Sequence, residues 1–145
     1  MDLNLLNKNF ESIKANPDEF AKSFYDRMFR TYPQVKPLFT KTDFSEQRKK
    51  LIQSLATVVS LASNPEGFAT YLDKLGRSHN EYGILARQYS YVTASLLATL
   101  RDTLGDDWTV EAADSWDTAL ELVSQQMINA QAVQRQSARF NKDKI

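Results

Sequence analysis

A single histidine and the absence of cysteine limit the chemistry that this 145-residue chain can host. The histidine is His79, within the segment LDKLGRSHNEYG at residues 72–83. Without cysteine the chain has no thiolate nucleophile, disulfide, zinc–thiolate site or iron–sulfur cluster. A Ser–His hydrolase is disfavoured because no Gly-x-Ser-x-Gly turn accompanies His79. Zinc is disfavoured because Asp73 and Glu81 do not share the helix face of His79 at a spacing of three or four residues.

Axial ligation of haem iron needs only one histidine from the protein, because the macrocycle supplies four nitrogens. Leu72 and Leu75 precede His79 by seven and four residues, so all three share one face of a helix. This spacing fits an iron ligand that projects into an apolar slot. It fits a buried structural histidine equally well, and the periodicity alone does not separate the two.

The elements that would position these residues are helices, since apolar residues recur every three or four positions rather than every two. Asn16 and Pro17 predict a helix start, while Pro33 and Gly105 predict helix ends. Ser45 is expected to cap the third helix. The expected helices cover residues 3–13, 17 to about 32, 45 to about 62, about 68 to 83, 87–104, and 109 onward. The fold class predicted from this pattern is all-α.

Charge and hydropathy exclude several kinds of partner. Lys and Arg number 18 and Asp and Glu number 18, so the chain lacks the excess of cations that a nucleic-acid or anionic-membrane binder uses. No apolar run is long enough to span a bilayer, and no signal peptide is visible at the start. We therefore expect no nucleic acid and no membrane partner, and a cytoplasmic location fits.

The chain has five segments whose residues and order along the sequence form a recognisable set: FYDRMFRTYPQVKPLF (24–39), SEQRKKLIQSL (45–55), LGRSHNEYG (75–83), YSYVTASLLATL (89–100) and WTVEAADSWDTAL (108–120). In these segments the chain resembles bacterial single-domain globins. They are similar to the haem domain of flavohaemoglobins and to neuroglobin-like bacterial globins. The resemblance runs from Leu3 to about Met127. It implies a globin fold, a three-over-three helical sandwich around haem b (iron protoporphyrin IX). The globin domain would span residues 1–131, and residues 132–145 would form a frayed or disordered extension.

The resemblance also assigns roles to residues. His79 matches the iron ligand, Phe39 the aromatic residue that packs on the porphyrin, and Tyr25 and Gln47 the distal residues that meet a gas ligand. The tyrosine hydroxyl could instead face water, and the glutamine could be an ordinary exposed helical residue. Two polar residues are expected at the haem: Lys50, which either pairs with a propionate or is solvated, and Tyr89 on the proximal side. The apolar walls of the haem site are expected from Leu51, Leu75, Ile84, Val92, Leu96 and Val123. Leu51 would also line the ligand pocket.

The function implied is reversible binding of O₂, and of NO and CO, at ferrous iron. This would serve oxygen binding and storage, or NO detoxification as an NO dioxygenase with a separate reductase partner. A haem-based gas or redox sensor and a globin-like module without haem are the alternatives. Gln131 stands where flavohaemoglobins carry a proximal glutamate, which argues against a strong electron push onto bound oxygen. The chain is expected to be a monomer or a weak homodimer.

Overall fold

The computed structural model describes the backbone of residues 1–81 and 85–143, and the side chains of residues 1–78 and 85–133. Within these residues the chain is helical and has no strand, which confirms the all-α prediction. The elements in order are α1 (Leu3–Lys14), α2 (Pro17–Thr31), the 3₁₀ helix η1 (Pro33–Phe39), α3 (Phe44–Leu61), α4 (Pro65–Glu81), α5 (Ala86–Leu104), the 3₁₀ helix η2 (Gly105–Asp107) and α6 (Val110–Asp143).

The helix ends show which local signals act. Pro17 opens α2, and Gly105 ends α5 with a φ of 54°, a left-handed conformation that favours glycine. Ser45 does not cap α3, contrary to the prediction. Asp43 takes that role, because its Oδ1 accepts hydrogen bonds from the backbone N–H groups of Ser45 at 3.0 Å and Glu46 at 3.4 Å. An ionised carboxylate is a strong acceptor there and also suits the positive end of the helix dipole.

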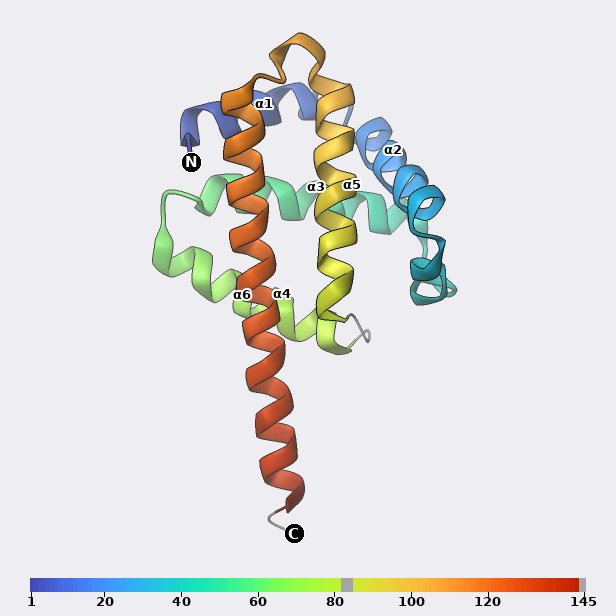
Figure 1. Cartoon of the computed structure of the whole chain (residues 1–145), viewed down its shortest axis with the longest axis vertical. Helices are drawn as coiled ribbons and strands as arrows, with labels where there is room; N and C mark the ends of the chain where they lie inside the picture. Colours follow the sequence, from blue (N-terminus) through green and yellow to red (C-terminus); the bar gives the residue numbers. More distant parts are fainter. Residues whose placement is uncertain (82–84, 144–145) are drawn as a thin grey trace.

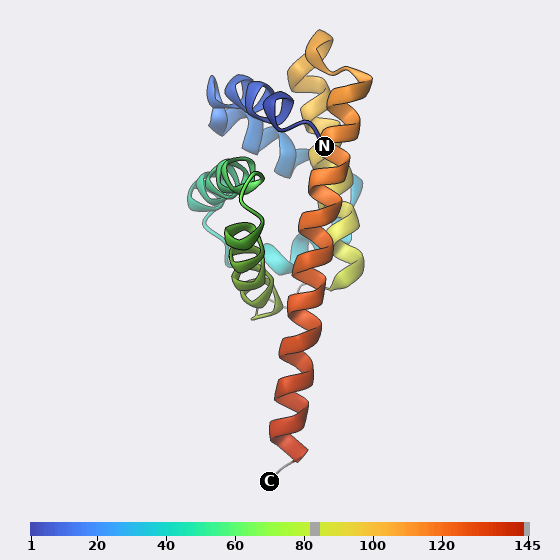
Figure 2. The ribbon, with the colours of Figure 1, turned by 90° about the vertical axis from the view of Figure 1, so that its left-hand side faces the viewer.

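The helices form two groups around a shared core. Helices α5 and α6 run side by side in opposite directions, joined by η2 (Figure 1). Helices α3 and α4 lie on one side of that pair when the molecule is turned (Figure 2). Helix α1 crosses near the start of α6, and α2 packs against α5 and α3. This arrangement brings α2, η1 and α3, which carry Tyr25, Phe39 and Gln47, together at one end of the core.

Helix α4 is fixed by a close crossing with α6. Gly76 is the contact point: a Cβ added there would lie 2.7 Å from the carbonyl oxygen of Met127 and 2.9 Å from the Cβ of Ala130. Only a residue without a side chain permits this approach. Since α4 also contains position 79, the crossing sets where the backbone of the predicted iron ligand lies.

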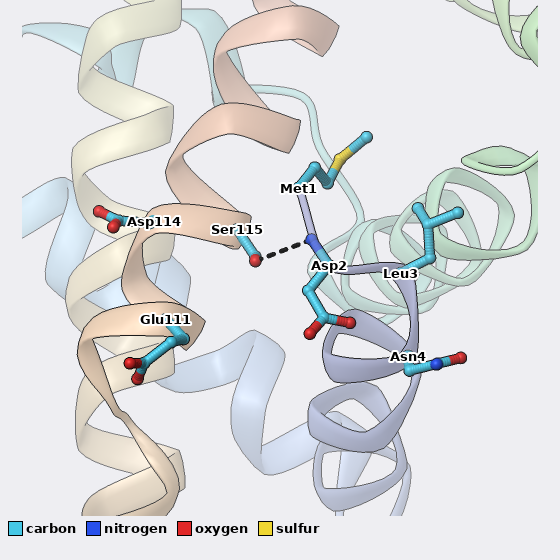
Figure 3. A pocket seen from close by; sticks show the side chains of 7 residues that line it. All are labelled: Met1, Asp2, Leu3, Asn4, Glu111, Asp114 and Ser115. Atoms are coloured by element: carbon cyan, nitrogen blue, oxygen red, sulfur yellow. Dashed lines mark hydrogen bonds between the residues drawn. The ribbon is translucent and has the colours of Figure 1, made fainter.

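Helix α1 is tied to α6 through the interior. The indole Nε1–H of Trp116 donates a hydrogen bond to Oδ1 of Asn9 at 3.1 Å, and both side chains are buried. At the surface, the backbone N–H of Asp2 donates to the Ser115 hydroxyl at 3.0 Å (Figure 3). These bonds join the first helix to the last one across more than a hundred residues of sequence.

Helix α6 extends well beyond the rest of the molecule (Figures 1 and 2). Its helical backbone continues to Asp143, although the apolar pattern of the sequence fades from about Ala132. The domain boundary at residue 131 stays a prediction. No helix within the described part of the chain is both long and apolar enough to cross a membrane.

Candidate functional site

The predicted distal residues meet in the structure. Tyr25 on α2 and Gln47 on the first turns of α3 are 22 residues apart in sequence, and the side-chain Nε2–H of Gln47 donates a hydrogen bond to the Tyr25 hydroxyl oxygen at 3.0 Å. Tyr25 is 6% exposed, so its ring belongs to the core and its hydroxyl is not a surface group. Gln47 is half-buried, unlike its exposed neighbours Glu46 and Lys49.

Four phenylalanines surround the Tyr25 ring. Its ring centroid lies 4.8 Å from that of Phe24, 6.1 Å from Phe29, 6.0 Å from Phe39 and 5.7 Å from Phe44. Most of these contacts are edge-to-face, the geometry that aromatic pairs prefer. The rings come from α2, η1 and the start of α3, and they hold the phenol in a setting of low polarity.

This setting controls both the protonation and the hydrogen bonding of Tyr25. Burial raises the pKa of the phenol above its ordinary value, and the hydrogen bond from Gln47 opposes that rise in pKa only in part. The phenol is therefore neutral at physiological pH. Because its oxygen accepts from Gln47, its own hydrogen remains to be donated, and no acceptor for it occurs among the described side chains. The pair thus presents one oriented O–H donor.

Several apolar side chains keep part of their surface uncovered and pack against the two hydrophobic clusters of the core. They are half-buried and come from η1, α3, α4 and α5: Phe39, Phe44, Leu51, Leu75, Val92 and Leu97. A single half-exposed leucine is ordinary, but all of these except Leu75 adjoin the cluster that contains Tyr25. Leu96 and Val123, also predicted as walls, are buried in the core. The predicted porphyrin contacts among the described apolar residues, Phe39, Leu51, Leu75, Val92 and Leu96, thus lie in the core or against it.

Two predicted contacts lie outside the described residues. These are the side chain of His79 and the whole of Ile84. Two residues that precede position 79 on the same face of α4 are described. Leu72 is buried in the core, and Leu75 is half-buried against the second hydrophobic cluster. This face of α4 is therefore turned inward one and two turns before position 79.

The two residues predicted to lie on the proximal side are both buried and come from different helices. Tyr89 on α5 is 4% exposed and Gln131 on α6 is 1% exposed. Gln131 follows Ala130, which contacts α4 at Gly76, so its position on α6 lies next to the α4 crossing. A glutamine there brings hydrogen-bonding capacity without a negative charge.

The predicted lysine contact is a surface residue. Lys50 is exposed on α3, and its neighbour Lys49 pairs with Glu46 at 3.6 Å. Each position fits a solvated cation at the edge of the site.

A hollow lies at the start of the chain, and Tyr25 does not line it. Figure 3 shows Asp2, the N-cap residue of α1, and Glu111, Asp114 and Ser115 of α6 around it. No cluster of potential metal ligands occurs within the described residues.

The sequence reasoning did not single out Phe29 and Phe44 as neighbours of Tyr25. A signal for both was present. Phe29 follows Tyr25 by four residues, so the two share a helix face, and Phe44 precedes Gln47 by three. Only the structure brings the three separate elements together around one phenol.

Comparisons with known proteins agree with the fold. The family model described as Globin matches residues 22–127. A flavohemoprotein from Rhizobium meliloti is 31% identical over 124 residues, which are 79% of this chain and 31% of that protein. A flavohemoprotein from Bacillus subtilis is 24% identical over 131 residues, 84% of this chain and 33% of that protein. The chain thus spans about a third of the length of these curated relatives.

Solved structures share the fold. A bacterial globin from Campylobacter jejuni superposes with a TM-score of 0.81 at 23% identity, covering 92% of this chain and 96% of that one. A hexacoordinated heme protein from an anhydrobiotic tardigrade superposes with a TM-score of 0.80 at 19% identity, covering 90% and 93%. At these identities the likeness establishes the three-dimensional arrangement of the helices.

Proposed function

Since the chain belongs to the globin family, we propose that it holds haem b through His79 and reversibly binds a diatomic gas, O₂, NO or CO, in the ferrous state. When bound, ferrous haem supplies one open coordination position for such a ligand. His79 is the only histidine, so no second imidazole of the same chain can compete for that position. The gas ligand therefore meets Tyr25 and Gln47 without having to displace a histidine.

The Tyr25–Gln47 pair is the observation that carries the proposal. The amide of Gln47 occupies the phenol oxygen and so directs the remaining hydroxyl hydrogen towards another acceptor. A dioxygen ligand carries partial negative charge, and a hydrogen bond to it is strong where water is excluded. The ring cluster around Tyr25 supplies that apolar setting. We expect this donor to slow the release of O₂.

Slow release suits oxygen storage or NO detoxification better than bulk transport. In the second role bound O₂ converts NO to nitrate, and each cycle then needs an electron to restore the ferrous state. A reductase would supply that electron. The relatives named flavohemoprotein extend well beyond the region that matches this chain. The uncharged Gln131 on the proximal side favours ligand retention over cleavage of the O–O bond.

The test is the rate of O₂ dissociation from haem-reconstituted protein, measured by stopped-flow displacement with CO. Tyr25→Phe removes the hydroxyl and keeps the ring, and we expect release to accelerate at least roughly tenfold, as one charge-assisted hydrogen bond is worth about 1.5–3 kcal/mol, or about ten- to hundredfold in rate. Tyr32→Phe is the matched control, because Tyr32 stacks on Tyr91 away from Gln47. An unchanged rate in Tyr25→Phe would remove this residue from ligand binding, and a chain that takes up no hemin would end the proposal.

A further inference from the structure

Two ion pairs join α2 to its neighbouring helices, and they lie on either side of Tyr25 along the chain. Near the start of α2, the Asp18 carboxylate accepts a hydrogen bond from the Nε–H of Arg48 on α3 at 2.8 Å. Two residues after Tyr25, Arg27 pairs with Asp102 on α5. The other ion pairs in the part of the chain that the structure describes form within single helices. The first pair therefore joins the same two helices as the hydrogen bond that orients the Tyr25 hydroxyl.

The first half of α3 packs on the core through half-buried side chains only. The buried residues of this helix are Leu55, Val58 and Val59, so none of residues 44–54 is fully buried. Gln47 lies in this lightly packed part. Helix segments with little buried surface shift or open at a low free-energy cost. The position of Gln47 therefore depends on the polar contacts that its own turn makes.

Arg48 differs from the lysines that follow it. Its side chain is 26% exposed, whereas the side chain of Lys49 is 65% exposed and forms its ion pair within α3. An ion pair with one largely buried member is screened less by salt and water than a fully exposed pair. Because Arg48 follows Gln47 directly, its pair with Asp18 lies on the turn of α3 that presents the Gln47 amide to the phenol.

We propose that Arg48 and Asp18 are positioning residues for the distal hydrogen bond, an inference that rests on the proposed function. Their ion pair holds the first turns of α3 against α2, so that Nε2 of Gln47 stays within hydrogen-bonding distance of the Tyr25 oxygen. Without the pair this turn shifts, the amide leaves the phenol, and the hydroxyl hydrogen is no longer directed to one acceptor. Release of O₂ then accelerates, but less than in Tyr25→Phe, because the hydroxyl itself remains.

The rate of O₂ dissociation tests this role. Arg48→Met removes the charge and keeps an unbranched side chain, and release should accelerate about two- to fivefold, the equivalent of about 0.4–1 kcal/mol. Asp18→Asn should have the same effect, and the two substitutions together should add nothing further. Arg48→Lys retains a cation that can reach Asp18 and should keep the wild-type rate. Lys49→Met is the matched control, since Lys49 pairs within its own helix, and it should leave the rate unchanged.

A second background shows whether the pair acts through Gln47. In Gln47→Leu the amide is already gone, so adding Arg48→Met should cause no further acceleration. High salt should raise the wild-type rate towards that of Arg48→Met, because Asp18 is 67% exposed and screening weakens its attraction to Arg48. The same salt should have little effect on Arg48→Met itself.

Nuclear magnetic resonance separates this inference from the proposed function. The ¹³Cζ signal of Tyr25, identified by its loss in Tyr25→Phe, reports the hydrogen bond that the phenol oxygen accepts. This signal should move in Arg48→Met and stay in place in Lys49→Met, and the same result is expected for the chain without hemin. A chain that takes up no hemin would therefore end the proposed function and leave this test of the ion pair intact.

Three results would overturn the inference. The first is an unchanged rate in Arg48→Met when Tyr25→Phe accelerates release. The second is equal acceleration by Arg48→Met in the wild-type and Gln47→Leu chains, which would show that α3 loosens as a whole. The third is an unchanged Tyr25 signal in Arg48→Met, which would show that the hydrogen bond does not depend on the ion pair.

Discussion

Tyr25 combines a core position with two hydrogen-bonding roles, and this combination can be tested through its ionisation. Burial raises the pKa of the phenol in the folded protein. The unfolded chain, whose tyrosine is solvated, therefore loses this proton at lower pH than the folded chain does. The resulting stability is fully present below about pH 10 and is lost as pH rises through the higher pKa of the folded state.

We therefore expect the free energy of unfolding of the wild type to fall more steeply above pH 10 than that of Tyr25→Phe. Urea titrations at several alkaline pH values would measure this difference, with Tyr32→Phe as the control. Parallel slopes for the wild type and Tyr25→Phe would show that the phenol ionises alike in the folded and unfolded chains.

At this scale the sequence predicted which residues belong together but not how they meet. The resemblance named Tyr25 and Gln47 as the two distal residues, and Leu51 and Leu55 follow Gln47 by four and eight residues on the same helix face. The direction of their hydrogen bond and the ring cluster depend on where α2 and α3 cross, which periodicity does not define. The roles of Lys50 and His79 stay predictions.

The contact between α4 and α6 rests on one glycine. In Gly76→Ala the new methyl group would lie 2.7 Å from a backbone oxygen of Met127, and backbone cannot rotate away as a side chain can. The helices must separate, and we expect a loss of about 2 kcal/mol in the free energy of unfolding, despite the better helix propensity of alanine. Chemical denaturation measures it.

Gly67→Ala is the matched control on the same helix. Its new methyl group would meet the side-chain Nδ2 of Asn64 at 2.9 Å, and the Oδ1 of the same side chain accepts a hydrogen bond from the N–H of Gly67 at 3.1 Å. A shift of this side chain weakens that cap while alanine favours the helix, so stability should change by less than about 1 kcal/mol. Equal losses in the two variants would mean that the α4–α6 crossing relaxes freely.

The bond between α1 and α6 has a similar test. Asn9→Leu leaves the buried indole N–H of Trp116 without an acceptor and should cost about 1–3 kcal/mol. In a Trp116→Phe background no N–H remains, so the same change should cost much less. Urea denaturation of the four proteins gives the coupling energy. A cost that is the same in both backgrounds would show that the hydrogen bond contributes nothing.

Element boundaries were predictable where a residue acts through its own backbone and less so where side chains compete. Pro17 and Gly105 act through φ, and both were read correctly. Asp43 and Ser45 are both good capping residues, and the choice between them depends on where the turn after η1 closes. The crossing at Gly76 has no periodic signature, because a helical glycine looks like a weakness in the sequence until its neighbour is known.

The whole molecule was the most predictable level. Apolar spacing indicated helices throughout, and the order of segments indicated the globin arrangement that the comparisons bear out. The length of α6 was not foreseen, because the apolar pattern of the sequence fades from about Ala132 and suggested a frayed end.

The central claim is that the one histidine of this chain holds a haem. The most direct measurement is the absorption spectrum of the full chain titrated with hemin, compared between the wild type and His79→Gly, with and without added imidazole. We predict that the wild type binds one equivalent of hemin with a Soret band at about 400–430 nm. We predict that His79→Gly loses this spectrum and that imidazole, which fits the space left by the deleted side chain, restores it. A His79→Gly protein that keeps the wild-type spectrum and stoichiometry without imidazole would contradict the account.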